Sequence, residues 1–348
     1  MHDLIIIGGG PAGCSAAECA GGLGKSVLLV EKEEHLGGVC LNTGCIPTKA
    51  LLHSARLYDH ARHGEAFGVK ASGLAFDYAV AKKRAGKVIE SLREGLRAIL
   101  KRNKAQAIRG EAALVGPEKV SVNGEIHEGR HILIATGARP SLPPVEGLED
   151  NDRVLTNEGI LALDKMPEEL AVIGAGVIGI EFACLYAMAG SRVTVLEMLP
   201  QICGGVEPEL ARLLQRKLEK SGVRFHLSAT VERLDGDRLH FRARGGARES
   251  LVADRILVAT GRRPNVEGLG LEKAGVSFDR KGIPVNDRAE TNAPGIYAAG
   301  DVTGKWLLAH FAARQARVAV RNMFGEKDFC REDTIPAVVY ADPEIAGA

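Results

Sequence analysis

Residues 4–13 read LIIIGGGPAG, and this stretch decides the fold. The isoleucine-rich run predicts a buried β-strand, the glycines predict a tight turn, and the small residues after them predict a helix. A second apolar run, residues 26–30, ends in Glu31. This is a GxGxxG turn in a βαβ unit with an acidic residue at the tip of the second strand, a pattern that favours dinucleotide binding. The turn glycines are Gly8, Gly10 and Gly13.

The same pattern occurs a second time, after a strand predicted at residues 171–173. In such a turn the first glycine permits the bend, the second lets the backbone approach a pyrophosphate, and the third packs helix on strand. The N–H groups at the helix start face the phosphates. Two copies in one register predict two dinucleotide sites rather than glycine turns in an unrelated α/β sheet. Each key residue of the second copy stands 166 positions after its counterpart in the first: Gly174, Gly176, Gly179 and Glu197.

Glu197 also bears on the choice of cofactor. A carboxylate at this strand end can accept both ribose hydroxyl groups of NAD, whereas it would repel the 2′-phosphate of NADP. NADH is therefore predicted over NADPH, and the alternative interpretation is a solvated acid at a strand end.

Two further strands match each other. Residues 131–137 read HILIATG, and residues 255–261 read RILVATG. From the first glycine of each turn to the ATG glycine the chain runs 129 residues in the first copy and 87 in the second, so the first copy carries about 42 extra residues. The insertion lies between Glu31 and Ala135 and holds the close pair of cysteines, so new chemistry is expected there.

That pair lies in residues 37–49, GGVCLNTGCIPTK, where four residues separate Cys40 from Cys45. Zinc sites commonly use two CxxC pairs, and no second pair exists here, so no metal site is predicted. On a regular α-helix the two Cα atoms would be about 8.6 Å apart, beyond the ~7 Å limit for a disulfide. Bridging requires a break, for which Gly44 and Pro47 are suited. A dithiol beside a dinucleotide site indicates flavin- or nicotinamide-linked electron exchange, the alternative being two buried small residues.

Composition narrows the class of protein. The 348 residues are 45% hydrophobic and 26% charged, which excludes disorder and suits about two domains. A net charge of +1 gives no basic surplus for nucleic acid or an anionic membrane. The seven cysteines are an odd number without a signal peptide, and the first apolar run is too short to span a membrane. A cytoplasmic protein is expected.

The motifs GGGPAG, GGVCLNTGCIPTK, GAGVIGIE, the two ATG strands and TNAPGIYAAGD occur in the order found in the pyridine nucleotide–disulfide oxidoreductases. Within that family the chain most resembles the dihydrolipoamide dehydrogenases, from about residue 3 to about residue 345. The resemblance implies an α/β fold with two Rossmann-like domains, for FAD and for NAD, the NAD domain being inserted in the FAD domain. The implied domains are an FAD-binding part with the redox insertion (residues 1–144), an NAD-binding domain (145–270), an FAD-binding or central part (271–335) and the start of a dimer-interface domain (336–348).

The resemblance also implies roles for the residues of the reaction. Cys45 would face the flavin and Cys40 would attack the substrate disulfide, while Lys49 would lie near the flavin N5 atom and pair with Glu181. The implied reaction converts dihydrolipoamide and NAD⁺ to lipoamide and NADH, on the lipoyl group of a 2-oxo acid dehydrogenase or glycine cleavage complex. The alternatives are a related NADH-dependent disulfide reductase and an FAD-binding redox or scaffold module without turnover.

Cofactor contacts follow from the same resemblance. Those to FAD would come from Gly8, Gly10, Pro11, Ala12, Gly13, Glu31, Lys32, Gly38, Val39, Cys40, Lys49, Ala112, Thr136, Gly137, Asp301 and Ala309. Those to NAD would come from Gly174, Gly176, Val177, Ile178, Gly179, Glu197, Val231, Gly261 and Arg262.

Two departures from the family pattern are visible. Val39 stands where the family typically has threonine, so a hydroxyl contact to the FAD phosphates would be missing. Full-length relatives are homodimers whose C-terminal domain supplies a His–Glu pair as proton carrier, whereas this sequence ends at YADPEIAGA and has no histidine after His310. General acid–base catalysis contributes about 10²–10⁴-fold. The 348-residue chain is therefore expected to reduce dyes with NADH, to turn over lipoamide weakly, and to lack most of the dimer surface, as a monomer would.

Overall fold

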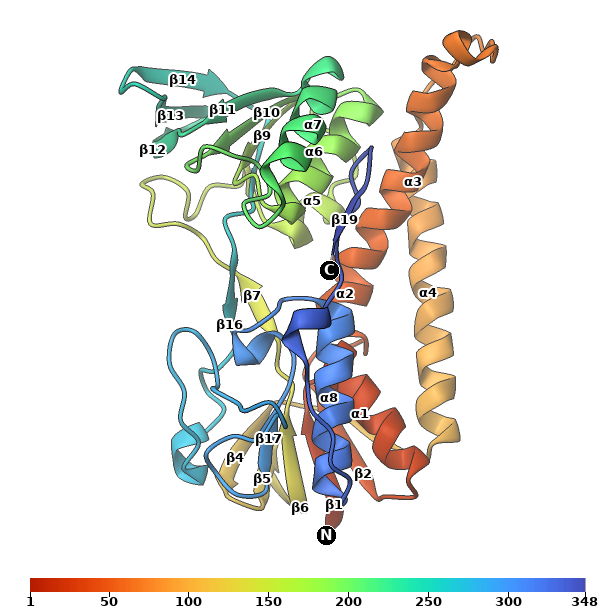
Figure 1. Cartoon of the computed structure of the whole chain (residues 1–348), viewed down its shortest axis with the longest axis vertical. Helices are drawn as coiled ribbons and strands as arrows, with labels where there is room; N and C mark the ends of the chain where they lie inside the picture. The colour runs from red at the N-terminus through yellow and green to blue at the C-terminus, as the bar shows by residue number, and fades with distance from the viewer. Residues whose placement is uncertain (348) are drawn as a thin grey trace.

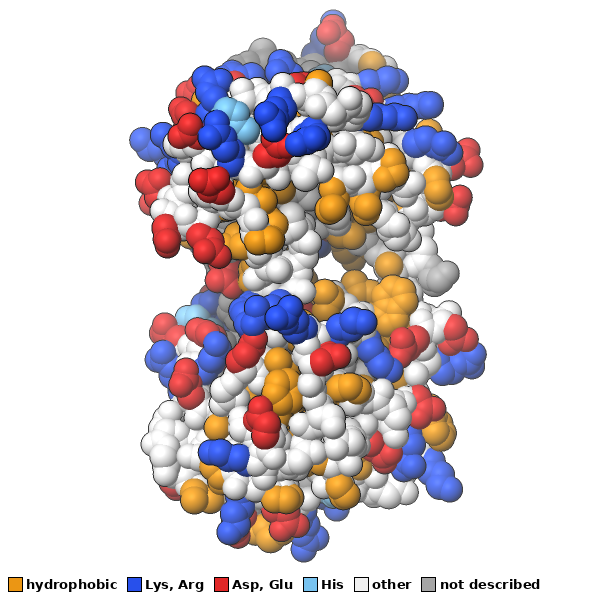
Figure 2. Space-filling model, turned by 90° about the vertical axis from the view of Figure 1, so that its left-hand side faces the viewer, with side chains coloured by type: hydrophobic (Ala, Val, Ile, Leu, Met, Phe, Trp, Pro, Cys, Tyr) orange, Lys and Arg blue, Asp and Glu red, His pale blue; other side chains and the backbone are white. Residues whose placement is uncertain are grey.

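A β-sheet forms the centre of each of two lobes, which are stacked along the long axis of the molecule (Figure 1); the central strands of both sheets are parallel, and β4, β5 and β6 of the first pair antiparallel. The computed structural model describes residues 1–347, so Ala348, the last residue of the predicted interface segment, lies outside the described residues. The space-filling view shows a hollow at the waist between the lobes (Figure 2). No helix within residues 1–347 is both long and apolar enough to cross a membrane.

The first sheet belongs to the lobe that contains the N-terminus. Its strands run in the order β3-β2-β1-β6-β5-β4, and β17 pairs with β6. The central strands read as predicted, since Ile5 pairs with Leu28 and Ile132 and all three are fully buried. The strands are β1 (His2–Ile7), β2 (Val27–Glu31), β3 (Gln106–Arg109), β4 (Ala112–Gly116), β5 (Lys119–Val122), β6 (Glu125–Ile134) and β17 (Ile296–Ala298).

Helices α1 (Pro11–Gly22) and α8 (Ala309–Met323) cover one face of this sheet (Figure 1). Their contact surface is made of alanines, which lets the two helices approach closely. On the other face, the 3₁₀ helix η2 (Leu271–Ala274) packs beside β4, where Leu114 N–H donates to the Leu269 carbonyl. The chain thus returns to the first lobe after the second lobe is complete.

The second sheet has the order β11-β10-β9-β15-β8, and all its strands are parallel. They are β8 (Val154–Leu155), β9 (Glu169–Ile173), β10 (Arg192–Glu197), β11 (Arg224–Leu227) and β15 (Arg255–Val258). Helices α5 (Asn157–Ala162), α6 (Val177–Ala189) and α7 (Pro208–Lys220) pack on one face. On the other lies an antiparallel sheet of β12 (Thr230–Asp235), β13 (Arg238–Arg242) and β14 (Arg248–Val252). The structure therefore confirms two Rossmann-like domains, the second inserted in the first.

Two short strands connect the domains at the waist. Strand β7 (Ala138–Pro140) leaves the first domain, β16 (Arg262–Pro264) returns to it, and the two pair with each other antiparallel. Domain boundaries at residues 144/145, 270/271 and 335/336 stay predictions.

The insertion predicted between Glu31 and Ala135 forms a helical arm. It contains α2 (Gly38–Thr43), α3 (Cys45–Arg62), the 3₁₀ helix η1 (Gly64–Phe67) and α4 (Tyr78–Arg102), and α3 and α4 run side by side (Figure 1). Buried alanines and leucines of α3 pack against α6 of the second domain. The arm therefore belongs to the core between the two domains as well as to the first.

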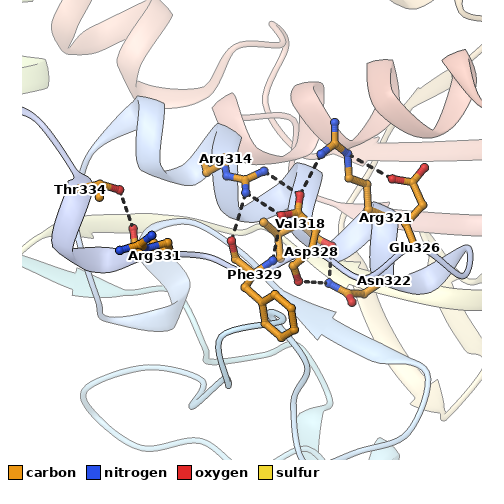
Figure 3. A network of polar contacts seen from close by, with 9 residues as sticks. All are labelled: Arg314, Val318, Arg321, Asn322, Glu326, Asp328, Phe329, Arg331 and Thr334. Carbon is orange, nitrogen blue, oxygen red and sulfur yellow. Dashed lines mark hydrogen bonds and ion pairs between the residues drawn. The ribbon is translucent and has the colours of Figure 1, made fainter.

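After α8 the chain turns back along that helix. The Asp328 carboxylate receives hydrogen bonds from Arg314 at 2.7 Å and from Arg321 at 3.0 Å, and Asn322 donates to the Asp328 carbonyl (Figure 3). The Arg314 guanidinium is the main reason that the pKa of Asp328 falls to about 2. This network anchors the segment that leads from α8 through η4 (Glu332–Thr334) to the last hairpin, β18 (Ala337–Val339) and β19 (Ile345–Gly347). The 3₁₀ helix η3 (Asp301–Thr303) lies before α8.

Candidate active site

The two glycine-rich turns have the same geometry. Gly8 and Gly174 directly follow the strands β1 and β9 and have φ of +108° and +101°, values that residues other than glycine rarely adopt. A Cβ atom on Gly13 would collide with the Gly8 carbonyl oxygen, and one on Gly179 with the Gly174 carbonyl oxygen. Helix and strand therefore touch at the third glycine of each turn, as the sequence pattern predicts.

The two strand-end acids act alike as well. Glu31 accepts hydrogen bonds from the backbone N–H of Gly9 at 2.7 Å and of Glu33 at 2.9 Å. Glu197 accepts them from Ala175 at 2.6 Å and from Leu199 at 2.8 Å. Each carboxylate thus fixes its own glycine turn, a role that the sequence did not reveal, and its remaining lone pairs are available to ribose hydroxyl groups.

Both turns leave room for a pyrophosphate. A Cβ on Gly176 would meet no heavy atom within 4 Å, and one on Gly10 would meet only the Cα of Gly38, at 3.9 Å. Val177 and Ile178, in the first turn of α6, are 41% and 36% exposed. Open backbone N–H groups at a helix start fit the phosphates of a dinucleotide, so the residues present suit a dinucleotide at each turn, and the assignment of FAD to the first and NAD to the second stays a prediction.

Helix α2, which carries Cys40, lies directly on the first glycine turn. A Cβ on Gly38, whose φ is +59°, would come 2.8 Å from the Cα of Gly10. Asn42 holds the segment by donating to the carbonyls of Leu36 and Gly38 at 3.1 and 2.9 Å, and it accepts from Arg93 of α4 at 2.8 Å. The cysteines that follow are therefore fixed beside the predicted FAD site.

Cys40 lies within α2, and Cys45 is the first residue of α3. The helix is interrupted at Gly44 (φ −142°, ψ −110°), which confirms the predicted break. Both cysteines are free thiols in this structure, and they lie close enough for each to alter the ionisation of the other. The break brings together two thiols that a continuous helix would hold apart.

The two thiols have opposite acidities. The hydrogen bond from Cys40, followed by the positive charge of Lys49, lowers the pKa of Cys45 to about 7 against the opposing effect of burial. The same hydrogen bond and burial raise the pKa of Cys40 well above its usual range. Cys45 is therefore the thiolate of the pair near neutral pH.

Lys49 and Glu181 meet as the family pattern implies. The Lys49 ammonium lies 2.6 Å from a Glu181 carboxylate oxygen, and the Glu181 side chain is 4% exposed. The other carboxylate oxygen accepts the backbone N–H of Tyr340 at 3.0 Å, while the Tyr340 ring faces Lys49 with 4.9 Å from Nζ to the ring centre. An ion pair of this kind requires such additional partners when one member is buried.

Arg262 and Asp301 also lie together, although the sequence assigned them to different cofactors. The Arg262 side chain donates to the Ala138 carbonyl, and its Nε lies 3.9 Å from Asp301. Burial raises the pKa of Asp301, whereas Arg262 opposes that shift. The contacts place Arg262 at the waist, between the two predicted cofactor sites.

The remaining predicted contact residues lie in varied settings. Thr136 donates through its hydroxyl to the Asn265 carbonyl at 2.8 Å, and Gly137 accepts the Asn265 N–H. Pro11, Ala12 and Ala309 lie at the starts of α1 and α8, and Gly261 has a φ of +136° just before β16. Ala112 and Val231 lie in antiparallel strands, Val39 lies in α2, and Lys32 is exposed beside Glu33.

Three residues of the site carry no signal in the sequence. Asn265 joins the waist to the first ATG turn, since its side chain donates to the Thr136 carbonyl at 2.9 Å. Tyr340 covers the Lys49–Glu181 pair. Asn157 donates to the carbonyl of Thr43, between the two cysteines. Within residues 1–347 no three His, Cys, Asp or Glu side chains gather closely enough to hold a metal ion.

Comparison with known proteins gives one consistent answer. Residues 2–316 match the family model of the pyridine nucleotide-disulphide oxidoreductases. The chain is 44% identical over 353 residues to dihydrolipoyl dehydrogenase of Thermus scotoductus and 40% identical over 350 residues to that of Bacillus subtilis, covering 99% of this chain and 76% of each relative. Among solved structures it resembles the HOCl-induced flavoprotein disulfide reductase RclA from Escherichia coli, with a TM-score of 0.87 and 29% identity, over 99% of this chain and 77% of that one.

Proposed function

Because this chain belongs to the pyridine nucleotide-disulphide oxidoreductase family, we propose that it oxidises dihydrolipoamide with NAD⁺ through FAD and the Cys40–Cys45 pair. It is an FAD- and NAD-dependent oxidoreductase of the disulfide type. The observation that carries the proposal is the thiol pair at the break between α2 and α3, with α2 touching the first glycine turn; the lowered pKa of Cys45 agrees with it.

The acidities assign a direction to thiol exchange. In the oxidised pair, a substrate thiolate attacks the Cys40 sulfur, and the S–S bond breaks to release Cys45, because the thiol of lower pKa is the better leaving group. The second substrate thiolate then attacks the substrate sulfur of the mixed disulfide and releases Cys40. Dihydrolipoamide has lost two electrons and two protons and become lipoamide. The pair has gained the two electrons, Cys40 takes up one proton as a thiol, Cys45 stays a thiolate, and the other proton passes to solvent.

Bound FAD supplies the two-electron exchange between the reduced pair and NAD⁺, which gives NADH. Lys49 places a positive charge beside Cys45 and favours its thiolate, while the buried Glu181 keeps the ammonium in position. The carboxylate of Glu197 repels a 2′-phosphate and favours NADH over NADPH. The proposed substrate is the lipoyl group of a 2-oxo acid dehydrogenase or glycine cleavage complex, and the proposed location is the cytoplasm.

The test separates the two half-reactions in the 348-residue polypeptide. Cys40→Ser and Cys45→Ser are each expected to abolish dihydrolipoamide oxidation while NADH-dependent dye reduction continues, since dye reduction bypasses the thiols. Cys19→Ser, a half-buried cysteine of α1, is the matched control and should retain both activities. Preference for another disulfide would favour a related NADH-dependent reductase, and a flavin that NADH never reduces would favour a module without turnover.

A further inference from the structure

The end of helix α2 is fixed by a hydrogen bond from the other domain. The last carbonyl groups of a helix have no partner within it, and here the chain breaks at Gly44. The carbonyl of Thr43, the last residue of α2, accepts a hydrogen bond of 2.7 Å from the side-chain amide of Asn157. Asn157 opens helix α5 of the second domain and is 6% exposed.

This contact differs from the others around α2. Asn42 and Arg93 hold the start and middle of the segment, and both belong to the first domain. Asn157 reaches Thr43 across 114 residues of sequence. A buried side-chain amide of the second domain thus holds the backbone between Cys40 and Cys45.

The position of Thr43 decides how the thiols meet. Cys40 precedes it by three residues in α2, and Cys45 follows it by two at the start of α3. A displacement of this junction moves the two sulfur atoms relative to each other. Hydrogen bonds weaken steeply as distance and angle depart from their optimum, so the bond between the thiols is sensitive to small displacements.

We propose that Asn157 is a positioning residue of the redox pair, whose amide holds Thr43 so that the Cys40 thiol stays within hydrogen-bond reach of the Cys45 sulfur. The role rests on the proposed function for its consequence in turnover, but its effect on the two thiols can be measured directly. Loss of the amide loosens the hydrogen-bonded dithiol. The reduced pair then becomes less favourable relative to the disulfide.

The effect of Asn157 on the thiols can be distinguished from the effects of the charged groups around them. Cys45 faces Cys40 from α2, Lys49 from its own helix and Glu181 from α6, and Cys40 also faces Asp301. Replacing the neutral Asn157 removes none of these groups. A change in thiol acidity in the variant therefore reports geometry rather than a lost charge.

The experiment uses FAD-loaded protein and two readouts. The first is the pH dependence of iodoacetamide alkylation, resolved for Cys40 and Cys45 by peptide mass spectrometry. The second is the ratio of oxidised to reduced dithiothreitol at which half of the pair is oxidised. In Asn157→Ala the alkylation midpoint of Cys45 should rise by roughly half a pH unit, equivalent to about threefold in its ionisation constant, and half-oxidation should occur at a severalfold lower ratio.

Two further variants make the result decisive. Asn157→Leu keeps the branched side-chain skeleton without the amide donor and should reproduce both shifts, which keeps the test available if the alanine variant folds poorly. Asn151→Ala removes another side-chain amide of the same domain, one that donates to the Gly236 carbonyl at 3.1 Å, and should change neither readout. Wild-type values in a folded Asn157 variant, or a change in its thermal stability alone, overturn the positioning role.

Turnover distinguishes this proposal from the proposed function. Thiol shifts in a protein that does not oxidise dihydrolipoamide support the positioning role and count against that substrate. If the protein oxidises dihydrolipoamide but neither thiol readout changes in the Asn157 variants, the proposed function is supported and the positioning role is overturned.

Discussion

Lys49 of α3 and Glu181 of the second domain form an ion pair of 2.6 Å, in which the carboxylate is almost completely buried. The two charges have opposite effects on the Cys45 thiol, because Lys49 lowers its pKa and Glu181 raises it. One contact between domains therefore sets the balance of charge at the thiolate.

The ion pair predicts opposite changes in thiol reactivity. Lys49→Met should raise the pKa of Cys45 above about 7 and lower its alkylation rate at pH 7, by about twofold for a rise of half a pH unit. Glu181→Gln should lower the pKa and raise the thiolate fraction. Alkylation rates measured from pH 5 to pH 9 test both signs. Lys82→Met, which removes an ammonium 3.0 Å from the exposed Asp164, serves as the matched control. A shift of the same sign in both variants would contradict the assignment.

The hydrogen bond between the thiols makes a second prediction. Cys40→Ala removes the main cause of the lowered pKa of Cys45, so that pKa should rise from about 7 toward the ordinary value of 9. Between these two pH values the variant should carry less thiolate than the reduced wild type. The measurement is the thiolate absorbance near 240 nm, titrated upward in pH. An unchanged midpoint near pH 7 would assign the acidity to Lys49 instead.

The glycines of the second turn should respond differently to alanine. Gly179→Ala places a Cβ against the Gly174 carbonyl and should lower the free energy of unfolding by about 1–3 kcal/mol. Gly176→Ala places its Cβ in open space at an ordinary φ of −68°, so folding should be unchanged while the KM for NADH rises about tenfold. Denaturant melts and NADH kinetics separate the two effects. Equal destabilisation by both substitutions would be evidence against the open pyrophosphate site.

The two strand-end acids form a matched pair for cofactor binding. Glu197→Gln should reduce kcat/KM for NADH about tenfold, equivalent to about 1.4 kcal/mol. It should also reduce the ratio of kcat/KM for NADH to kcat/KM for NADPH. Glu31→Gln alters the equivalent carboxylate of the first domain and should weaken FAD retention instead. FAD content after gel filtration and steady-state kinetics with both nucleotides are the measurements. If Glu197→Gln left the preference for NADH intact, another group would have to exclude the 2′-phosphate.

The Asp328 network predicts a pH-dependent stability. The pKa of Asp328, about 2, lies below the usual 3.8. The contribution of the Asp328 carboxylate to the free energy of unfolding is therefore complete above about pH 4 and is lost as the pH falls through 2. Asp328→Asn should lower the free energy of unfolding at pH 7 by about 1–2 kcal/mol, after allowance for partly exposed arginines. The difference from wild type should shrink below pH 4. Asp333→Asn, at the exposed pair with Arg331, is the control, and an equal loss there would refute the special role of Asp328.

Much of this architecture could be predicted because its signals are local. The glycine turns, their strand-end acids and the break at Gly44 each follow from residues close in sequence. The Lys49–Glu181 contact came from the family pattern, and the structure places the two side chains together. Their catalytic and cofactor-binding roles stay predictions that the experiments above address.

The parts that could not be predicted depend on contacts between distant segments. Asn157 reaches Thr43, and Tyr340 reaches Glu181, only after both domains have folded against the arm. A single asparagine or tyrosine has no periodicity that would mark such a partner. The same holds for Arg262, whose motif predicted a cofactor contact but not its approach to Asp301.

The pairing of β7 with β16 brings the two ends of the second domain together. The chain enters and leaves it through adjacent antiparallel strands, with Pro140 opposite Arg262. Because its two ends are already neighbours, replacing the whole unit by a short turn would add little loop-closure entropy. Exchange of nucleotide specificity by transplanting this unit between relatives is therefore compatible with an intact first sheet.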